Sequence, residues 1–391
     1  MGVFFTHCKN IDIIYFSVII FSMISIRDTF YNIRNKMFPV GHIVESLPYI
    51  IVFKTTNWCW YNCPHCCESA GTNNKKEYIP VDVIESYINQ ACDDKKFSKD
   101  IVLTGGEITS AYMHYTADYV PRLLNTALDN KCNVDIKTNA GWAVSKNPIK
   151  NQVLNDLVAT LSAHSSGTMN INPMSISLSL DRFHPHSLEK NTEFITEMSR
   201  RQKNSSCMIH VSSFNQDKDM FYKLLENLQK YNLPVNELMF VGENQKQTRK
   251  DIDNTWWSVG GNVLLHFSTG TLFDGGRAKD LPNAYHTPAP QFSFISRAQN
   301  PSVLMAFDTY GNVTLGENSG RKITVPWRNK DGTPRPLTDI RQDLVKKARW
   351  EEVRYNVETI HLTNKAILQG IKSDFNHAMV LLGIKKQEKN R

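Results

Sequence analysis

Three cysteines within eight residues form the clearest chemical feature of this 391-residue chain. Three residues separate Cys59 from Cys63, and two separate Cys63 from Cys66. One short loop with this spacing can bind one compact inorganic centre, and thiolates are soft ligands that favour zinc or an iron–sulfur cluster. Closed sites of either kind prefer four protein ligands. Since Cys67 directly follows Cys66 and adjacent residues rarely point at one metal, the loop indicates three ligands and one open position.

The remaining cysteines leave two other interpretations of the loop open: a structural zinc site, or three thiols without a shared role. The chain has eight cysteines, and none follows Cys207. A disulfide scaffold would spread cysteines through a short secreted chain, and this chain is long with half of its thiols in one loop. The usage therefore predicts a reducing, cytoplasmic setting with a single metal or cluster site.

The overall composition is that of a globular protein. Hydrophobic residues make up 41% of the chain, and 45 basic against 38 acidic side chains give a formal charge of +7. These values lie outside the range of disordered chains. A mild basic excess does not by itself indicate nucleic acid, and none is expected as a partner. It would suit an acidic protein partner.

The first 36 residues contain an apolar stretch at 11–26. It is shorter than the ~20 residues of a membrane-spanning helix, and no small-residue cleavage site follows it. Three interpretations remain: a membrane-surface anchor, a buried helix, or translated upstream sequence with the working start at Met23 or Met37. We favour the last two over membrane contact through residues 11–26.

Apolar runs that favour strands alternate with helical patterns from residue 47 onward. The predicted strands are residues 49–53, 101–103, 134–139, 174–181, 207–211 and 238–242. The predicted helices are a segment opening at Pro80 and residues 120–128, 152–161, 193–201 and 220–231. This alternation predicts an α/β fold with a parallel sheet, either open and doubly wound or wrapped as a partial barrel. In both arrangements functional residues gather at the carboxyl ends of the strands.

The region after residue 242 is less regular. Residues 303–307 and 313–315 are predicted to form a hairpin around Tyr310, Gly311 and Asn312. Residues 318–338 are rich in glycine, proline and charge, which predicts a loop. Two helical stretches, 339–355 and 364–383, end the chain before a basic tail.

Cys59-x3-Cys63-x2-Cys66, joined with Gly105-Gly106-Glu107 at the end of the next strand, resembles the radical S-adenosylmethionine (radical SAM) enzymes. The resemblance covers about residues 47–280 and implies a partial (β/α)6 TIM-like barrel. It also implies that the three cysteines bind a [4Fe–4S] cluster whose fourth iron chelates S-adenosylmethionine. Reductive cleavage of that cosubstrate yields a 5′-deoxyadenosyl radical, which abstracts a hydrogen atom from substrate.

The resemblance also implies a binding site for S-adenosylmethionine. Gly105, Gly106 and Glu107 match the motif that binds the methionine amino group. Ser179 and Asp181, at the end of the fourth strand, match positions that contact the methionine carboxylate or the ribose. His65, before the last cluster ligand, stands where the family has an aromatic residue near the adenine, although the commoner residues there are tyrosine and phenylalanine.

Three further segments are less specific. Thr138 and Asn139 end the third strand and either line the same opening or form a turn. His184 either reaches the site or caps its loop. The segment 275–278 resembles a Gly-Arg-Ala turn that follows the sixth strand in many peptide-modifying members, which would make residues 262–267 the sixth strand instead.

The C-terminal region resembles a SPASM-type extension without cysteines, because Leu315 and Gly316 stand where a metal ligand is expected. The predicted division is therefore an N-terminal segment (1–46), a radical SAM core (47–280) and a small C-terminal α+β accessory region (281–391).

The resemblance leaves three functions to compare. The first is a radical SAM enzyme acting on a peptide or protein side chain, and the second acts on a small metabolite or nucleoside. The third is a zinc-binding α/β protein without enzymatic activity. Reduced flavodoxin or ferredoxin is the electron donor that the resemblance implies.

Overall fold

The computed structural model describes residues 44–144, 146–164, 173–202, 206–238, 252, 255–270, 276–281, 303–315 and 322–354. The chain divides into two compact units, residues 47–344 and residues 1–46 together with 345–391. Of the second unit, only 44–46 and 345–354 are described, so the predictions for residues 11–26 and for the helix at 364–383 fall outside the described residues. The domain division predicted at residues 46 and 280 stays a prediction.

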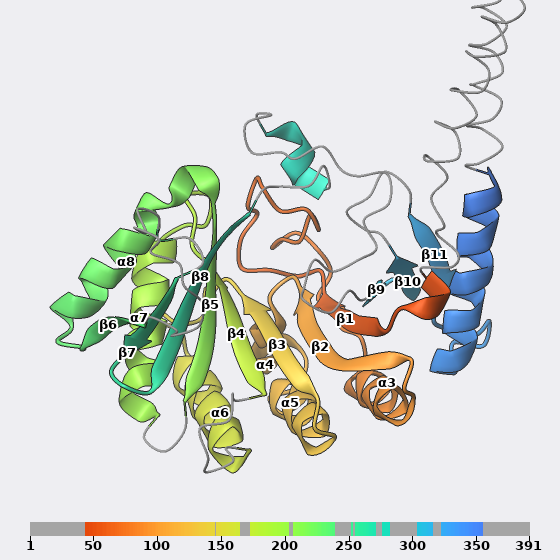
Figure 1. Cartoon of the computed structure of the whole chain (residues 1–391), viewed down its shortest axis with the longest axis horizontal. Coiled ribbons are helices and arrows are strands. Elements are labelled where there is room, and N and C mark those ends of the chain that lie inside the picture. The colour runs from red at the N-terminus through yellow and green to blue at the C-terminus, as the bar shows by residue number, and fades with distance from the viewer. Residues whose placement is uncertain are drawn as a thin grey trace, which may run out of the picture. The chain divides into compact units, whose positions relative to one another are not determined.

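One large sheet organises residues 47–344 (Figure 1). Its strands are β1 (Tyr49–Thr56), β2 (Phe97–Gly105), β3 (Asn133–Thr138), β4 (Met174–Ser179), β5 (Cys207–Phe214), β6 (Val235–Leu238), β7 (Trp256–Val259), β8 (Val263–Gly270), β9 (Val303–Phe307), β10 (Asn312–Leu315) and β11 (Ile323–Pro326). They lie in the order β11-β10-β9-β1-β2-β3-β4-β5-β8-β7-β6. The strands from β9 through β1 to β5 and β8 are parallel, and antiparallel strands flank them on both sides.

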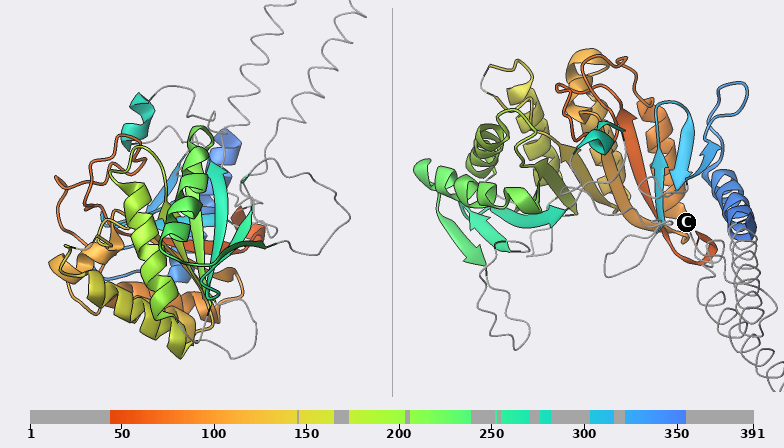
Figure 2. Two further views of the ribbon diagram at one scale, coloured as in Figure 1. Left: turned by 90° about the vertical axis from the view of Figure 1, so that its left-hand side faces the viewer. Right: turned by 90° about the horizontal axis from the view of Figure 1, so that it is seen from above.

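The crossover helices lie together on one face of the curved sheet (Figures 1 and 2). They are α3 (Val81–Asp93), α5 (Tyr119–Asp129), α6 (Lys150–Ala163), α7 (Ser187–Arg201) and α8 (Asp219–Lys230). Each buries an apolar stripe at helical spacing; in α3 the stripe includes Val81, Ile84, Tyr87 and Ile88. Since the helices α3, α5, α6, α7 and α8 form one layer, the sheet wraps in one direction.

This strand order confirms the partial barrel. From β1 to β5 the strands lie side by side in chain order, whereas a doubly wound sheet would reverse direction at a switch point. The sheet is open, with β11 and β6 at its two edges.

Of the first assignment of the sixth parallel strand, 238–242, only Leu238 is described, and it ends the antiparallel strand β6; the strand that follows β5 in the sheet is the alternative near 262–267. β8 pairs parallel with β5 along its whole length, from Cys207 opposite Val263 to Phe214 opposite Gly270. β6 is an antiparallel edge strand that reaches the sheet only through β7. An apolar run alone does not distinguish a parallel strand from an edge hairpin, because both place β-branched residues in an extended backbone.

The C-terminal strands extend the same sheet. β9 pairs parallel with β1, and the predicted hairpin of β9 and β10 is confirmed, with Gly311 in the turn at φ +91°. β11 falls inside the stretch predicted as loop, because glycine, proline and charged neighbours obscured a strand of four residues. The Tyr87 hydroxyl donates to the backbone oxygens of Trp327 (3.1 Å) and Arg335 (3.0 Å), which ties α3 to the segment after β11.

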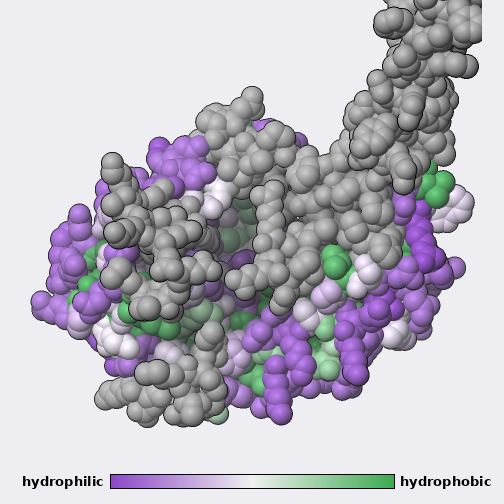
Figure 3. All heavy atoms as spheres, viewed as in Figure 1, coloured by the Kyte–Doolittle hydropathy of each residue, from purple (hydrophilic) through white to green (hydrophobic). Residues whose placement is uncertain are grey.

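A helix over 337–354 agrees with the predicted start of the first C-terminal helix. Its buried side chains within residues 47–344 are Leu337, Ile340 and Leu344. On the surface shown in Figure 3, hydrophilic side chains dominate the rim of the described part, and apolar ones show mainly toward its middle. Among the described residues, no helix combines the length and apolar character needed to span a bilayer.

Candidate active site

A cavity of about 270 Å³ lies at the carboxyl ends of the parallel strands, beneath the loop that follows β1. The predicted site residues that line it are Cys59, Cys63, His65, Cys66, Gly105, Gly106 and Ser179. Thr138, Asn139 and His184, each with two interpretations from the sequence, line it as well. The structure thus brings the cysteine loop, the Gly-Gly strand end and the ends of β3 and β4 around one space.

The three spaced cysteines are held differently from their neighbour Cys67. Cys59 and Cys63 are buried, Cys66 is half-buried and Cys67 is exposed. Burial raises the pKa of the Cys59 thiol to about 12, and the nearby charges of Glu107, Cys63 and Cys66 raise it further. Several like-charged donors crowded in one buried place form the kind of site that a metal cation relieves, because coordination deprotonates the thiols.

Arg277, which follows the last parallel strand of the core, β8, binds this loop through hydrogen bonds. It lies in a short 3-10 helix (Gly276–Asp280), and its guanidinium donates from Nε to the Cys63 carbonyl (2.9 Å) and from Nη2 to the Ala70 carbonyl (2.6 Å). Its backbone N–H donates to the Cys66 carbonyl (3.1 Å). The arginine therefore fixes the loop on both sides of its last two thiols.

Gly105 and Gly106 allow the end of β2 to approach the cysteine loop closely. The Gly106 N–H donates to the Thr56 carbonyl (2.5 Å), and the Glu107 N–H donates to the Trp58 carbonyl (2.9 Å). A β-carbon on Gly106 would lie 1.9 Å from the Trp58 oxygen, and Gly105 has a φ of +113°, a conformation that favours glycine. Any side chain at these two positions would push the strand end away from the loop.

Glu107 lies behind the cavity wall, fully buried, instead of lining the space. Its oxygens accept hydrogen bonds from the hydroxyls of Thr109 (2.8 Å) and Thr138 (2.9 Å) and from the Asn139 N–H (3.0 Å). Burial raises the pKa of this carboxyl, and the donated hydrogen bonds partly oppose the shift. The carboxylate therefore joins the ends of β2 and β3.

Asn139 connects this carboxylate to the cysteine loop. Its backbone donates to Glu107, and its side-chain Nδ2 donates to the Sγ of Cys59 at 3.2 Å. Its side-chain oxygen accepts from the Gly141 N–H at 2.8 Å, which fixes the amide orientation. One residue at the end of β3 thus contacts both predicted halves of the site.

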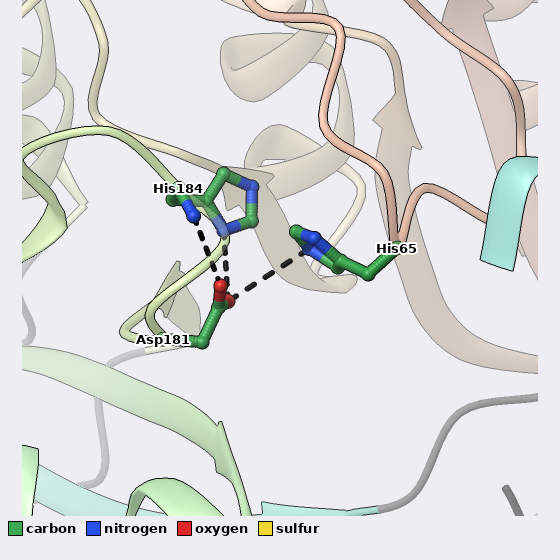
Figure 4. A group of neighbouring side chains, drawn as sticks. All are labelled: His65, Asp181 and His184. Atoms are coloured by element: carbon green, nitrogen blue, oxygen red, sulfur yellow. Dashed lines mark hydrogen bonds and ion pairs between the residues drawn. The ribbon is translucent and has the colours of Figure 1, made fainter. Parts of the chain in front are cut away.

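His65, Asp181 and His184 face one another beside the cavity (Figure 4). The Nδ1 of His184 lies 2.8 Å from Asp181 Oδ2, and His65 Nε2 lies 3.8 Å from the same oxygen. Burial would raise the pKa of Asp181, but hydrogen bonding and charge from His184 outweigh it and lower the pKa. Burial likewise opposes protonation of His184, yet its contacts with Asp181 and Cys63 raise its pKa to about 9. His65 is different, because burial lowers its pKa to about 4.

These three side chains each offer one ligand atom, and the atoms lie within 4.8 Å of one another. Two histidines and one carboxylate could hold a divalent ion. However, Asp181 Oδ1 also accepts from the N–H groups of Phe183 (2.9 Å) and His184 (3.1 Å), so the carboxylate is already well occupied. We therefore interpret the group as a charge network that orients a neutral His65 ring, which packs 5.1 Å from Phe183.

The sequence did not predict the side-chain contacts of three residues at the site. The side-chain roles of Arg277 and Asn139 depend on partners 214 and 80 residues away, although both follow strand ends, which was the available signal. Lys190 of α7 is buried, with its ammonium donating to the Tyr61 hydroxyl and to the Pro185 carbonyl (2.6 Å). No sequence signal marked it, because lysines on helices are normally solvated.

The chain is similar to radical SAM enzymes of known structure. SuiB of Streptococcus suis, bound to S-adenosylmethionine, aligns with a TM-score of 0.38 and 14% identity over 68% of this chain and 60% of that chain. Native anSMEcpe with bound AdoMet gives a TM-score of 0.39 and 11% identity over 82% of this chain and all of that chain. HydG, a maturase of the [FeFe]-hydrogenase, aligns with a TM-score of 0.31 and 13% identity over 50% of this chain and 43% of that chain.

No family model and no curated protein matches the sequence. The chain spans 60% of SuiB and about half of anSMEcpe in its complex with the Cp18Cys peptide, which aligns over 48% of its length.

Proposed function

We propose that this chain is a radical SAM enzyme. It would hold a [4Fe–4S] cluster on Cys59, Cys63 and Cys66 and bind S-adenosylmethionine in the adjoining cavity. The observation that carries the proposal is that these three thiols and the Gly105–Gly106 strand end line the same 270 Å³ space. When bound, such a cluster supplies one electron that cleaves the sulfonium and yields a 5′-deoxyadenosyl radical able to abstract a hydrogen atom.

The cluster loop has the donor set that such a centre requires. Cys59, Cys63 and Cys66 line the cavity, and Cys67, which also borders it, is exposed. The Asn139 side chain donates to the sulfur of Cys59, as expected for a site that stabilises thiolates. Three thiolates would leave one coordination position of such a cluster for a small ligand, and the residues beside the thiols in the cavity could surround that ligand.

The residues proposed to bind S-adenosylmethionine form two groups, those that line the cavity and those that lie behind its lining. Gly105, Gly106 and Ser179 line the cavity, and His65 presents a flat, neutral ring to it. Glu107 and Asp181 lie behind them. For Glu107 to pair the methionine ammonium, it would exchange one of its hydrogen bonds from Thr109, Thr138 or Asn139. Burial would strengthen that pairing, because a charged group attracts its partner more strongly away from water.

We propose a peptide or protein side chain as the substrate. The support is the Gly276-Arg277-Ala278 turn after the sixth parallel strand, where Arg277 fastens the cluster loop. One structural neighbour, anSMEcpe, has been solved with bound AdoMet and a peptide. We assign residues 47–280 to the catalytic core and residues 281–391 to an accessory region. Since Cys207 is the last cysteine, the accessory region has no thiols for a second cluster.

The experiment that tests the enzyme class is anaerobic purification followed by iron, sulfide and zinc analysis. We expect about four irons with matching sulfide per chain. Addition of dithionite and S-adenosylmethionine should then release 5′-deoxyadenosine. Zinc without sulfide, or an intact cluster that never yields 5′-deoxyadenosine, would overturn the proposal.

The substrate class needs a separate measurement. A cell extract dialysed to separate polypeptides from small molecules would be supplied in two fractions to the loaded enzyme. We expect the polypeptide fraction to raise 5′-deoxyadenosine formation above the rate without substrate. Stimulation by the small-molecule fraction alone would favour a metabolite or nucleoside instead.

A further inference from the structure

The electron that the proposed cluster needs must arrive from outside the cavity. The cavity side of the three thiols is where S-adenosylmethionine and substrate would lie. A donor protein therefore has to approach the cluster loop from its outer side. The inference below rests on the proposed function and identifies that side.

A layer of aromatic rings lies next to Cys59 in the fold. Trp58 and Trp60 flank Cys59 in the chain, and their ring centroids lie 4.8 Å apart in an edge-to-face arrangement. The ring of His114, at the end of the short helix α4 (Ala111–His114), lies 4.5 Å from Trp58 and 6.3 Å from Trp60. These three rings thus connect the end of α4 to both chain neighbours of a residue that would bind iron.

The surface over this layer is apolar at its centre. Met113 and Tyr115 expose 47% and 48% of their area, although both are large apolar residues. Tyr115 is held in place by stacking on Tyr78 at 5.3 Å. Tyrosine and methionine are enriched in the centres of protein interfaces, where a preordered ring loses little entropy on binding.

Positive charge borders this apolar centre. Lys76 lies over the Trp58 ring, with Nζ 5.7 Å from the centroid, and the side chain of Lys75 is 86% exposed. Lys75 has an exposed partner, Glu77, at 3.5 Å, an ion pair that solvent weakens. Burial lowers the pKa of His114, and the nearby positive charge of Lys76 lowers it further.

We propose that Lys75, Lys76, Met113 and Tyr115 form the docking surface for a small acidic one-electron carrier protein. Electron-transfer complexes bury little surface area, so a patch formed by only a few residues is sufficient. Complementary charge raises the association rate more than it raises affinity, which suits a donor that must leave again. One electron moves from the reduced carrier to the cluster, the carrier is oxidised by one electron, and no proton or group is transferred.

The test compares two ways of supplying the same electron. Flavodoxin, reduced by NADPH and its reductase, requires docking, whereas dithionite does not. K75E/K76E is compared with K95E/K96E. The control makes the same charge change on two consecutive exposed lysines that directly precede β2, whereas the cysteine loop contacts the carboxyl end of that strand. We expect K75E/K76E to lower the flavodoxin-driven rate of 5′-deoxyadenosine formation by about tenfold or more at low salt. K95E/K96E should not, and the dithionite-driven rate should be unchanged in both.

Two further arms keep the outcome decisive. The deficit of K75E/K76E should shrink as salt is raised to about 0.5 M, because exposed charges are then screened. M113E provides a single change at the apolar centre and should lower the flavodoxin-driven rate alone. Equal flavodoxin rates in K75E/K76E, K95E/K96E and the parent protein would overturn the docking surface. Loss of the dithionite-driven rate in the parent protein would instead overturn the proposed function.

Discussion

Cysteines, asparagines, carboxylates and paired lysines occur at both ends of the parallel strands in residues 47–344. At the amino ends they lie singly or in pairs: Cys207 begins β5 and is fully buried, Asn133 begins β3 and donates to Asp100 at 2.8 Å, and Cys132 interacts with Cys92. At the carboxyl ends the same residue types form a larger group, in which Asn139 contacts both Cys59 and Glu107. The difference teaches that residue type alone does not make a site, because a site needs several such groups at one point.

Cys207 and Cys59 also differ in why their thiols resist ionisation. Burial alone raises the pKa of Cys207 to about 12. For Cys59 the pKa rises to a similar value because burial acts together with the charges of Glu107, Cys63 and Cys66. A bound cation would offset the negative charges around Cys59, whereas Cys207 has no such charges to offset. The two thiols therefore allow a direct comparison of burial with and without neighbouring charge.

Removal of a thiol should separate the two ends most strongly. Cys59→Ala, Cys63→Ala or Cys66→Ala should each lower bound iron from about four per chain toward background, because a three-thiolate loop has no spare ligand. Formation of 5′-deoxyadenosine should disappear with the iron. Cys207→Ala should keep both and lower the free energy of unfolding by about 1 kcal/mol. Any of the three loop variants that retains a full cluster would refute the ligand assignment.

Two carboxylates, Asp100 within β2 and Glu107 after its end, should differ next. Glu107→Gln places an amide N–H₂ against donors from Thr138 and Asn139, and should weaken binding of S-adenosylmethionine about tenfold to hundredfold. Isothermal titration under anaerobic conditions measures this. Asp100→Asn should leave binding unchanged and stability within about 0.5 kcal/mol. Equal binding by both variants would mean that Glu107 supports neither the ligand nor the strand ends.

Two arginines make a third comparison. Arg277→Ala removes hydrogen bonds to the Cys63 and Ala70 carbonyls, and should lower the free energy of unfolding by about 1–3 kcal/mol. Iron should also be lost faster to a chelator. Arg122→Ala removes surface ion pairs to Asp82 and Glu85, which solvent weakens, and should lower stability less than Arg277→Ala, with the rate of iron loss unchanged. The same rate of iron loss in both variants would exclude a role of Arg277 in fixing the loop.

The smallest effect is expected from the asparagines at the two ends of β3, Asn133 at its start and Asn139 just after its last residue. Asn139→Ala keeps the backbone N–H that donates to Glu107 but removes the donor to the Cys59 sulfur. Hydrogen bonds to cluster sulfurs favour the reduced state, so the midpoint potential should become more negative. Asn133→Ala should leave the potential unchanged. A redox titration followed by electron paramagnetic resonance measures both, and identical potentials would show that the hydrogen bond has no influence.

Local patterns were sufficient for much of the fold. The helix α3 follows from Val83, Ile84, Tyr87 and Ile88 at helical spacing, and β1 follows from a continuous apolar run. These signals depend on neighbours within one or two turns, so the chain itself carries them. The sixth parallel strand was ambiguous for the same reason, since a local pattern does not say which strand pairs with β5, and in the structure β8 does so while β6 pairs only with β7.

The sequence by itself determined the cysteine loop, the Gly105–Gly106 strand end and their placement at carboxyl ends of strands, because spacing and periodicity are local properties. Only the tertiary structure decided that Asn139 donates to Cys59, that Arg277 holds the Cys63 carbonyl and that Asp181 lies between two histidines. It also placed β9 beside β1. These contacts join residues that are distant in the chain, and no local pattern records which strand ends a curved sheet brings together.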